Sequence, residues 1–381
     1  MRVLILLDYY LPGFKGGGPA KSIFNLISHL NSLYEFSIIT SDRDLGDSSS
    51  YSNVTHDKWM KFDDVKIFYA SPKSLNFFNL LKIIRNHNYD IIYINSFFSF
   101  TFAIQPLLGA LFSVIPREKI LLAPRGELEA GCLEVKSNKK RLFLFFSKTI
   151  RLYDNLKFQA TSKHEVTSIK KVLKNRVKNI VISENLGPKA LPGSFNQNKP
   201  RTSEMPLRIC FFSRITREKN LNYALDIIKA VVIPIKFDIY GTNHEDEKYW
   251  SICKKKMKSI NEKSIEYMGS LKPNEVNNMF KNYDLFFFPT KGENYGHVII
   301  ESLSAGTPVL IADTTPWRNL EIAGVGWDVP LDKPELFIDK INNLYSLSPL
   351  SYIEMRKKAL NFAIRVGNDK DILNNAKNLF N

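Results

Sequence analysis

Cysteine is scarce in this chain, whose 381 residues include only Cys132, Cys210 and Cys253. The three are far apart and show no paired spacing, which excludes a disulfide scaffold and a cysteine-based zinc site and suits a reducing compartment. The six histidines are scattered as well. We therefore expect no histidine-based metal cluster.

A long uninterrupted hydrophobic run is also missing. The N-terminal run at 3–7 stops at Asp8, so it is shorter than the roughly 7–15 apolar residues of a signal peptide and indicates a buried strand. The uncharged stretch 91–116 is long enough to span a bilayer. It is interrupted by Asn95, Ser96, Ser99, Thr101, Gln105 and Pro106. A strand at 91–95, a loop and a buried helix at 101–115 explain this stretch without a membrane span.

Material for buried cores, by contrast, is abundant. Hydrophobic residues make up 44% of the chain and aromatic residues 12%, and the length suits two domains of roughly 150–200 residues each. Two series of strand–helix alternation follow one another. We expect strands of the first series at 3–7, 36–40, 65–69, 91–95, 120–123 and 158–160, with a helix at 20–30. Those of the second are expected at 207–212, 236–240, 265–268, 285–288 and 309–312, with helices at 221–231, 249–260 and 274–282.

Such alternation predicts an α/β protein with two parallel sheets, each covered by helices. The predicted domains are 1–194 and 207–365, joined by a polar linker at 195–206. We also expect a C-terminal helix at 366–381 that packs back on the N-terminal domain. Ligands of such sheets bind at the carboxyl ends of the strands, so the natural site is the cleft between the two domains.

The net charge of +15 is concentrated in one segment. Residues 136–178 hold 13 basic side chains against Asp154 and Glu165, and they include the aromatic run at 142–146. A basic segment with interleaved aromatics can bind anionic lipid or nucleic acid. A solvated helix face with a few core phenylalanines is the third interpretation. Binding to the membrane surface is favoured over the other two.

Four segments contain residues that could carry chemistry, and each follows an expected strand. In 290–301, Glu293 and Glu301 flank an expected helix start near Gly296, where exposed backbone N–H groups favour an anion such as a diphosphate. Arg214 and Lys219 could converge on the same diphosphate. The other two segments are the glycine run Gly16, Gly17 and Gly18, which allows close backbone approach, and Arg125 with Glu127.

The segment from Glu293 onward closely resembles the retaining glycosyltransferases of family 4, of the polysaccharide-assembly type. The resemblance rests on the Glu-x7-Glu pattern of Glu293 and Glu301, on Tyr295-Gly296, on residues 301–309 and on Thr315-Pro316-Trp317. It implies the GT-B fold, in which two Rossmann-like parallel-sheet domains face each other across a cleft.

The resemblance also implies roles for the candidate residues. Glu293 would lie over the donor sugar, Glu301 would bind the nucleotide ribose, and Asn294, Tyr295 and Gly296 would hold the sugar and phosphate. Arg214 and Lys219 would neutralise the diphosphate, and the glycine loop 16–18 would close on it. Where many members have a histidine, this chain has Arg125, so its contact is left open between a donor hydroxyl, an acceptor phosphate and a structural bond to a strand-end carbonyl. Glu127 is a candidate for acceptor recognition.

The implied activity is a metal-independent, retaining transfer of a hexosyl or acetylhexosaminyl group. The donor would be a UDP or GDP sugar, with no further cofactor. The acceptor would be a polyprenyl-diphosphate-linked glycan for surface polysaccharide, either O-antigen or capsule, on the inner face of the plasma membrane. Two alternatives are a GT-B sugar-nucleotide epimerase and a nucleic-acid-binding protein with a degenerate site. The intact acidic and basic pairs argue against both, and we expect no nucleic-acid partner.

Overall fold

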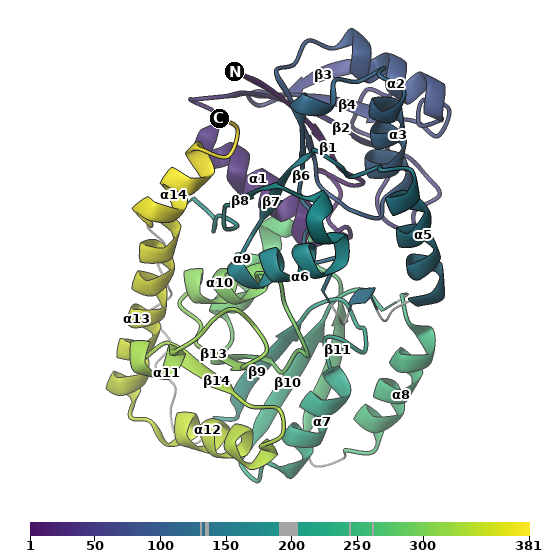
Figure 1. Cartoon of the computed structure of the whole chain (residues 1–381). Coiled ribbons are helices and arrows are strands. Elements are labelled where there is room, and N and C mark those ends of the chain that lie inside the picture. The colour runs from purple at the N-terminus through teal and green to yellow at the C-terminus, as the bar shows by residue number, and fades with distance from the viewer. Residues whose placement is uncertain (130–131, 134–136, 190–204, 244, 261–262) are drawn as a thin grey trace. The chain divides into compact units, whose positions relative to one another are not determined.

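The computed structural model describes residues 1–129, 132–133, 137–189, 205–243, 245–260 and 263–381. It divides the chain into two compact units, Met1–Leu186 with Asp369–Asn381, and Gly187–Asn368. Each unit is a sheet with helices on both faces (Figure 1). Most of the predicted linker lies outside the described residues, so the domain bounds expected from the sequence stay a prediction.

The first unit contains a sheet of eight strands in the order β3-β4-β2-β1-β5-β6-β7-β8. All neighbouring strands are parallel except β3 and β4, which are antiparallel. The strands are β1 Arg2–Leu6, β2 Glu35–Ser41, β3 Trp59–Phe62, β4 Val65–Ala70, β5 Ile91–Ile94, β6 Ile120–Leu122, β7 Lys157–Ala160 and β8 Asn179–Ile182. The sequence did not predict β3 and β8, because both are short edge strands without a buried apolar run.

Helices cover both faces of this sheet. Side chains of α1 (Gly18–Leu30) and α14 (Lys370–Lys377) share one apolar cluster with the strands. The opposite cluster contains side chains from four other helices. These are α2 Phe77–Asn86, α3 Gln105–Leu111, α5 Ser137–Thr149 and α6 Lys163–Leu173. Parallel strands buried on both faces in this way account for the nearly continuous apolar runs that the sequence analysis used.

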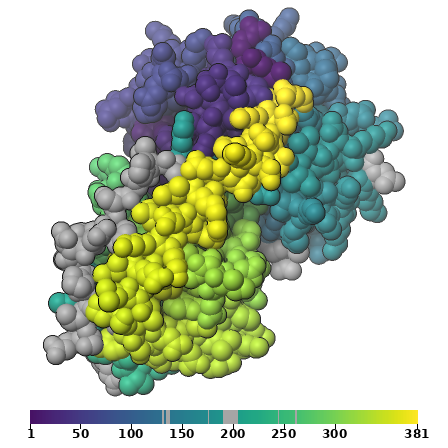
Figure 2. Space-filling model, turned by 90° about the vertical axis from the view of Figure 1, so that its left-hand side faces the viewer, coloured from purple at the N-terminus to yellow at the C-terminus, as the bar shows by residue number. Residues whose placement is uncertain are grey.

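The C-terminal end of the chain belongs to the first unit. The ring of Phe380 lies 5.1 Å from that of Tyr34 and 5.5 Å from that of Tyr93, both edge-on. In Figure 2 the last residues, in yellow, lie against the purple N-terminal segment. Aromatic burial therefore fixes the last helix of the chain on the face that α1 covers.

The second unit has six strands in the order β11-β10-β9-β12-β13-β14, all parallel. The strands are β9 Leu207–Phe212, β10 Ile235–Tyr240, β11 Ser264–Gly269, β12 Leu285–Phe288, β13 Val309–Ala312 and β14 Gly326–Val329. The helices are α7 Leu221–Ala230, α8 Glu247–Lys258, α9 Pro273–Lys281, α10 His297–Ser304, α11 Leu320–Ala323, α12 Pro334–Ser346 and α13 Pro349–Gly367. Of these strands, only the edge strand β14 was not predicted.

The strand order of each sheet reverses at one place. In the first unit β1 is followed by β2 on one side, whereas β5 lies on its other side; in the second unit β10 and β12 flank β9 in the same way. The chain therefore leaves adjacent strands in opposite directions, which opens a crevice at their carboxyl ends. These two points of reversal are the places where each unit can hold a ligand.

The uncharged stretch 91–116 folds as a strand followed by helix. A π-helical turn, Phe100–Ile104, leads directly into α3, and Pro106 occupies the first turn of α3, where its missing N–H costs no hydrogen bond. None of the helices within the described residues is long and apolar enough to cross a membrane.

Candidate functional site

A buried ion pair marks the point where the strand order reverses in the second unit. Lys219 follows β9 and Glu293 follows β12, and the Lys219 Nζ donates a hydrogen bond of 2.7 Å to the Glu293 Oε1. Their side chains are 11% and 15% exposed. Residues 74 positions apart meet because β9 and β12 are adjacent parallel strands whose carboxyl ends lie at one edge.

Backbone contacts hold the two loops of this pair together. The backbone N–H of Lys291 donates to the carbonyl of Glu218 over 2.8 Å. The buried Thr290 hydroxyl donates to the same carbonyl, and the Asn220 side chain donates to the carbonyl of Pro289. The positions of Lys219 and Glu293 are thus set by the neighbouring backbone as well as by their own attraction.

Burial has the largest effect on the Glu293 carboxyl. It raises the pKa of Glu293 above its ordinary value, while the charges of Lys219 and Arg214 and the hydrogen bond from Lys219 lower it. The pKa of Glu293 rises overall because the removal of a carboxylate from water costs more free energy than the single short contact with Lys219 provides. A site with this carboxyl and a nearby ammonium group can accept a proton or hold an anion and a hydroxyl side by side.

Arg214 lies in the loop after β9 but pairs with a different carboxylate. Its Nη1 is 3.0 Å from an oxygen of Glu245, and the Arg214 side chain is 41% exposed. Close packing shapes this loop, because Gly241 has φ of +138° and a Cβ there would lie 1.6 Å from the carbonyl oxygen of Ser213. Only glycine allows β10 to end so close to the loop. Arg214 is near enough to affect Glu293 electrostatically, but its ion-pair partner Glu245 was not foreseen.

The helix after Glu293 begins without a side-chain cap. Gly296 is the residue before α10 and has the left-handed φ of 78° that favours glycine. The Trp317 indole donates to the carbonyl of Tyr295 over 2.5 Å, and the two rings lie edge to face. Asn294 lies in the same loop, and the partly buried Glu301 lies on α10. The unit therefore places Glu293, Asn294, Tyr295 and Gly296 on one loop that leads into a helix N-terminus, where backbone N–H groups favour an anion.

Gly16 and Gly17 lie in the first unit just before α1, and Gly18 is the first residue of that helix. A Cβ on Gly16 would be 2.7 Å from the Cβ of Tyr9, Gly17 has φ of 74°, and a Cβ on Gly18 would meet nothing within 4 Å. Gly16 and Gly17 thus have local structural reasons to be glycine, whereas Gly18 has none. Their predicted contact with the donor stays a prediction.

Arg125 also lies in the first unit, and its guanidinium has several partners there. Nε and Nη2 donate to the Asn95 side chain over 3.0 and 2.6 Å, Nη1 donates to Asn185 over 2.5 Å, and Nη2 also donates to the Tyr93 hydroxyl over 2.7 Å. Arg125 itself has a φ of 56°. These partners are side chains and not the strand-end carbonyl of the structural alternative, so the predicted contact of Arg125 with donor or acceptor stays a prediction.

Glu127 is held at three points. Its Oε1 accepts from the Ser96 hydroxyl over 2.9 Å, and its Oε2 accepts from the backbone N–H groups of Phe97 and Phe98 over 2.9 and 2.8 Å. Burial raises the pKa of Glu127, against these hydrogen bonds. The carboxylate therefore organises the turn that follows β5, and its predicted role toward the acceptor stays a prediction.

Glu165 was not among the site residues predicted from the sequence. It is buried and accepts hydrogen bonds from the backbone N–H groups of Gly126 and Thr161. Ser162 caps the same helix by accepting from the N–H of Glu165. The Ser-x-x-Glu spacing is the signal that could have found this residue.

Within the described ranges, no group of three or more His, Cys, Asp or Glu side chains comes together as a metal site. The metal-free reaction stays a prediction.

The comparison with protein families identifies the second half of the chain. Residues 194–364 match the family described as Glycosyl transferases group 1. The chain carries a group 1 glycosyltransferase domain. Arg214, Lys219, Glu293 and Glu301 all lie within the matched residues. The two glutamates and two cations singled out in the sequence therefore belong to the part of the chain whose family is recognised.

One curated relative matches a larger share of the chain. It is the protein described as "Uncharacterized 41.2 kDa protein in cps region" from Klebsiella pneumoniae, 21% identical over 243 residues. The match covers 63% of this chain and 64% of the relative, so the chain spans less than two thirds of that relative's length.

Solved structures match almost the whole chain. Sucrose-phosphate synthase from Thermosynechococcus elongatus has a TM-score of 0.68 at 13% identity, covering 98% of this chain and 96% of that one. HepE from Anabaena, solved in complex with UDP-glucose, has a TM-score of 0.65 at 13% identity, covering 99% of this chain and 98% of that one. The predicted fold class is confirmed: the chain has two parallel-sheet α/β domains, and its structural neighbours are GT-B glycosyltransferases.

Proposed function

We propose that this protein transfers a sugar from a nucleoside diphosphate to a hydroxyl group of an acceptor, with retention of the anomeric configuration. The observation that carries the proposal is the Lys219–Glu293 pair, which lies where the strand order reverses in the recognised glycosyltransferase domain. HepE, one of the structural neighbours, binds UDP-glucose, so UDP-sugars are the first donors to test. The transferred group is a hexose or an acetylhexosamine.

The chemistry proposed for the donor needs positive charge beside the departing diphosphate. The ammonium of Lys219, the guanidinium of Arg214 and the N-terminal end of α10 would supply it. The bond between the anomeric carbon and the phosphate oxygen breaks, and a bond to the acceptor oxygen forms on the same face of the sugar. The diphosphate takes the proton of the acceptor hydroxyl. We assign no metal ion and no protein base to this step.

Glu293 would act on the sugar rather than on the diphosphate. In the free protein its Oε1 is bonded to Lys219, and an arriving diphosphate would compete for that ammonium. The carboxylate would then accept a hydrogen bond from a hydroxyl of the donor sugar, because a buried carboxylate binds hydroxyl groups well. Glu301 and residues 294–296 would hold the ribose and the phosphate groups from α10 and from the loop before it.

The acceptor that we propose is a lipid-linked glycan of surface polysaccharide, at the inner face of the plasma membrane. The description of the Klebsiella relative places it in a cps region, and helix α5 provides a surface that suits anionic lipid. Phe143 and Leu144 pack against the core of the first unit, whereas Leu142, Phe145 and Phe146 are exposed. Lys139, Lys140, Arg141 and Lys148 flank these exposed apolar groups in the sequence, a combination found in helices that bind at the membrane interface.

Incubation with UDP- and GDP-sugars and a polyprenyl-diphosphate glycan tests the activity. We expect transfer with EDTA present, a product whose anomeric configuration matches that of the donor by NMR, and a loss of about 100-fold or more in kcat for Glu293→Gln. Thr314→Val, which removes only a hydroxyl bonded to the carbonyl of Thr290, is the matched control on the adjacent loop. Isomerisation of the donor without any acceptor, or inverted product, would contradict the proposal.

Flotation with vesicles tests the membrane contact separately. We expect the protein to float at low salt with vesicles rich in anionic lipid and to stay behind with neutral vesicles. The double variant Phe145→Glu and Phe146→Glu should lose this binding. The control changes two exposed apolar residues of the second unit, Val232→Glu and Ile322→Glu. Equal flotation of both double variants would exclude α5 as the contact.

A further inference from the structure

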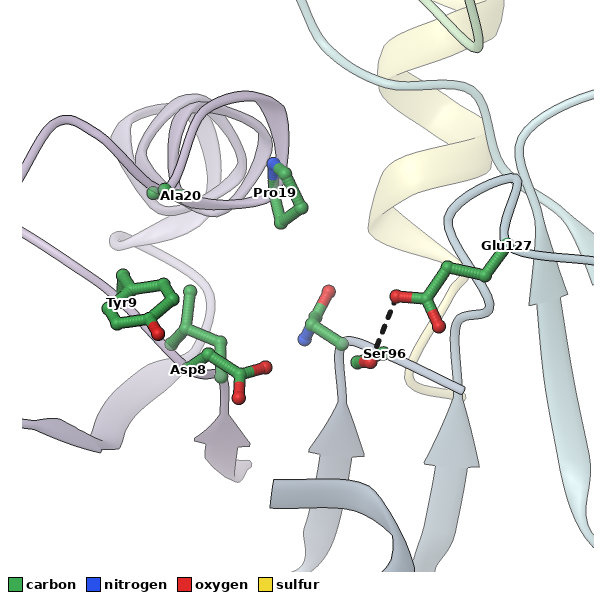
Figure 3. Close-up of a pocket in the computed structure, with 9 residues that line it drawn as sticks. Asp8, Tyr9, Pro19, Ala20, Ser96 and Glu127 are labelled. Carbon is green, nitrogen blue, oxygen red and sulfur yellow. Dashed lines mark hydrogen bonds between the residues drawn. The ribbon is translucent and has the colours of Figure 1, made fainter. Parts of the chain in front are cut away.

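The point where the strand order reverses in the first unit holds a pocket of about 180 Å³. Residues that follow β1 and β5 line it from below, Glu127 lines it from one side, and the first turn of α1 lines it from above (Figure 3). Its volume is well below the roughly 300–1,000 Å³ of sites for drug-sized ligands. A pocket of this size suits one small ring and not a nucleotide.

The polar lining follows directly from the course of the two strands. The chain is buried from Val3 in β1 to Leu7, and it then places Asp8 and Tyr9 at the carboxyl end of the strand. β5 ends in the same way with Asn95 and Ser96. A crevice at a reversal of strand order is where ligands of open α/β sheets bind. The polar residues of the lining therefore lie where the fold favours a ligand.

The Asp8 carboxylate faces the open space of the pocket. Figure 3 shows its carboxylate pointing into the gap between α1 and Ser96. Its Oδ1 accepts a hydrogen bond of 2.7 Å from the Ser99 hydroxyl, and burial raises the pKa of Asp8. The Glu127 carboxylate lines the other side but is already held by Ser96 and two backbone N–H groups. The two acids are close enough that the charge of Asp8 raises the pKa of Glu127.

Among the residues that the structure describes, the lining includes no basic side chain. Arg125 is bonded to the lining residue Asn95, and its Nε, Nη1 and Nη2 all donate to neighbouring side chains of the same unit. A carboxylate or phosphate in the pocket would thus meet two acidic groups without a cation of the lining to offset them, and like charges in close contact are strongly unfavourable. Sugar hydroxyls, by contrast, can donate hydrogen bonds to a carboxylate.

We propose that this pocket binds an uncharged sugar ring of the acceptor, with Asp8 accepting hydrogen bonds from its hydroxyl groups, and that it excludes acidic sugars. The assignment of this ring to the acceptor rests on the proposed glycosyl transfer. The binding of a neutral ring does not depend on that transfer. This assignment restricts the acceptor class: the sugar that enters the pocket is a neutral hexose or acetylhexosamine and not a uronic acid or a sugar phosphate.

Direct binding to the whole protein is the first test. Ligand-observed NMR would compare methyl glycosides in matched pairs, namely glucoside with glucuronide, galactoside with galacturonide, and N-acetylglucosaminide. We expect at least one neutral glycoside to bind, and its uronide to bind roughly tenfold more weakly or worse. Binding of no neutral glycoside, or equal binding of both members of a pair, would overturn the proposal.

Variants connect the binding to the pocket. Asp8→Asn should weaken the neutral glycoside roughly tenfold or more and reduce its advantage over the uronide. Asp63→Asn, at an exposed carboxylate of the same unit, is the control that should change nothing. Ala20→Leu fills the pocket from α1 without changing any charge and should abolish binding. If Asp8→Asn fails to fold, Ala20→Leu decides: unchanged binding by that variant places the sugar elsewhere.

Two measurements separate this proposal from the proposed function. If the protein transfers sugar from a nucleotide donor equally well to neutral and acidic acceptors, the pocket assignment is wrong and glycosyl transfer stands. If a neutral glycoside binds in an Asp8-dependent manner but no nucleotide sugar supports transfer, the pocket assignment stands and the proposed function fails.

Discussion

Replacing Lys219 by methionine removes one partner of the buried pair and leaves Glu293 in place. The variant keeps an unbranched side chain, one atom shorter, and deletes the charge of Lys219 and its 2.7 Å hydrogen bond. An ionised carboxyl with 15% exposure then loses its ion-pair partner. Breaking a buried pair in this way costs about 3–5 kcal/mol when the remaining group stays charged.

Glu293 can instead become neutral by binding a proton. For a carboxyl with an ordinary pKa of 4.5, this costs about 3.4 kcal/mol at pH 7, at about 1.36 kcal/mol per pH unit. Since burial raises the pKa of Glu293, the cost is smaller. We therefore expect Lys219→Met to lower the free energy of unfolding of the second unit by about 2–3 kcal/mol at pH 7.

The sign of the pH dependence follows from the same argument. Without Lys219 the pKa of Glu293 rises further, so the folded state holds the proton more tightly than the unfolded state does. The variant is then closest to wild type at low pH and loses stability as the pH rises through the raised pKa. At pH 5 the deficit should shrink to about 1 kcal/mol or less, since two pH units are worth about 2.7 kcal/mol.

Denaturant unfolding of the whole chain, followed by tryptophan fluorescence, measures this deficit. Three of the four tryptophans, Trp250, Trp317 and Trp327, lie in the second unit. In a Trp59→Phe background the signal reports that unit alone. Adding Glu293→Gln to Lys219→Met removes the stranded charge and should restore most of the lost stability. A deficit that is equal at pH 5 and pH 7, or that the second substitution leaves unchanged, would refute the reasoning.

Three further predictions concern other contacts. Gly241→Ala should cost about 3 kcal/mol or more in the same fluorescence assay, because of its positive φ and the overlap of a Cβ with backbone; Gly292→Ala, with open space around it, should change stability by less than about 1 kcal/mol. Arg125→Lys should lower the stability of the first unit by about 2 kcal/mol, measured through Trp59, because lysine cannot reproduce the fork of hydrogen bonds; an unchanged midpoint would contradict this. Arg214→Ala should lower kcat of transfer by about 100-fold or more while changing stability by less than about 1 kcal/mol, since its ion pair is exposed. Arg217→Ala, which breaks a similarly exposed pair, should retain activity.

The strands whose predicted bounds agree with the structure to the residue are strands buried on both faces. The predicted bounds 207–212, 285–288 and 309–312 are those of β9, β12 and β13. Such strands need apolar side chains on both sides, so they appear as continuous apolar runs. The edge strands β3, β8 and β14 pair on one side only and include partly exposed residues. Their short mixed sequences could not be distinguished from loops.

The candidate site was only partly accessible to sequence reasoning. Motif spacing selected Glu293 and Lys219 separately, and nothing in the sequence predicted that they bond to each other. Arg125 was left open between three contacts, and its bonds to the side chains of Asn95, Asn185 and Tyr93 are none of these three. Asp8 was noted as one carboxyl near a strand end. Its pocket becomes visible only when β1 and β5 lie side by side.

The sequence by itself determined the class of the fold, the positions of the buried strands along the chain and the loops that carry candidate residues. Those features depend on local apolar periodicity and on turn residues, which act over a few positions along the chain. The tertiary structure alone decided which loops meet, because adjacency of β1 with β5 and of β9 with β12 is a property of strand order. It also decided which charged groups are buried, since a side chain loses water only when distant segments pack around it.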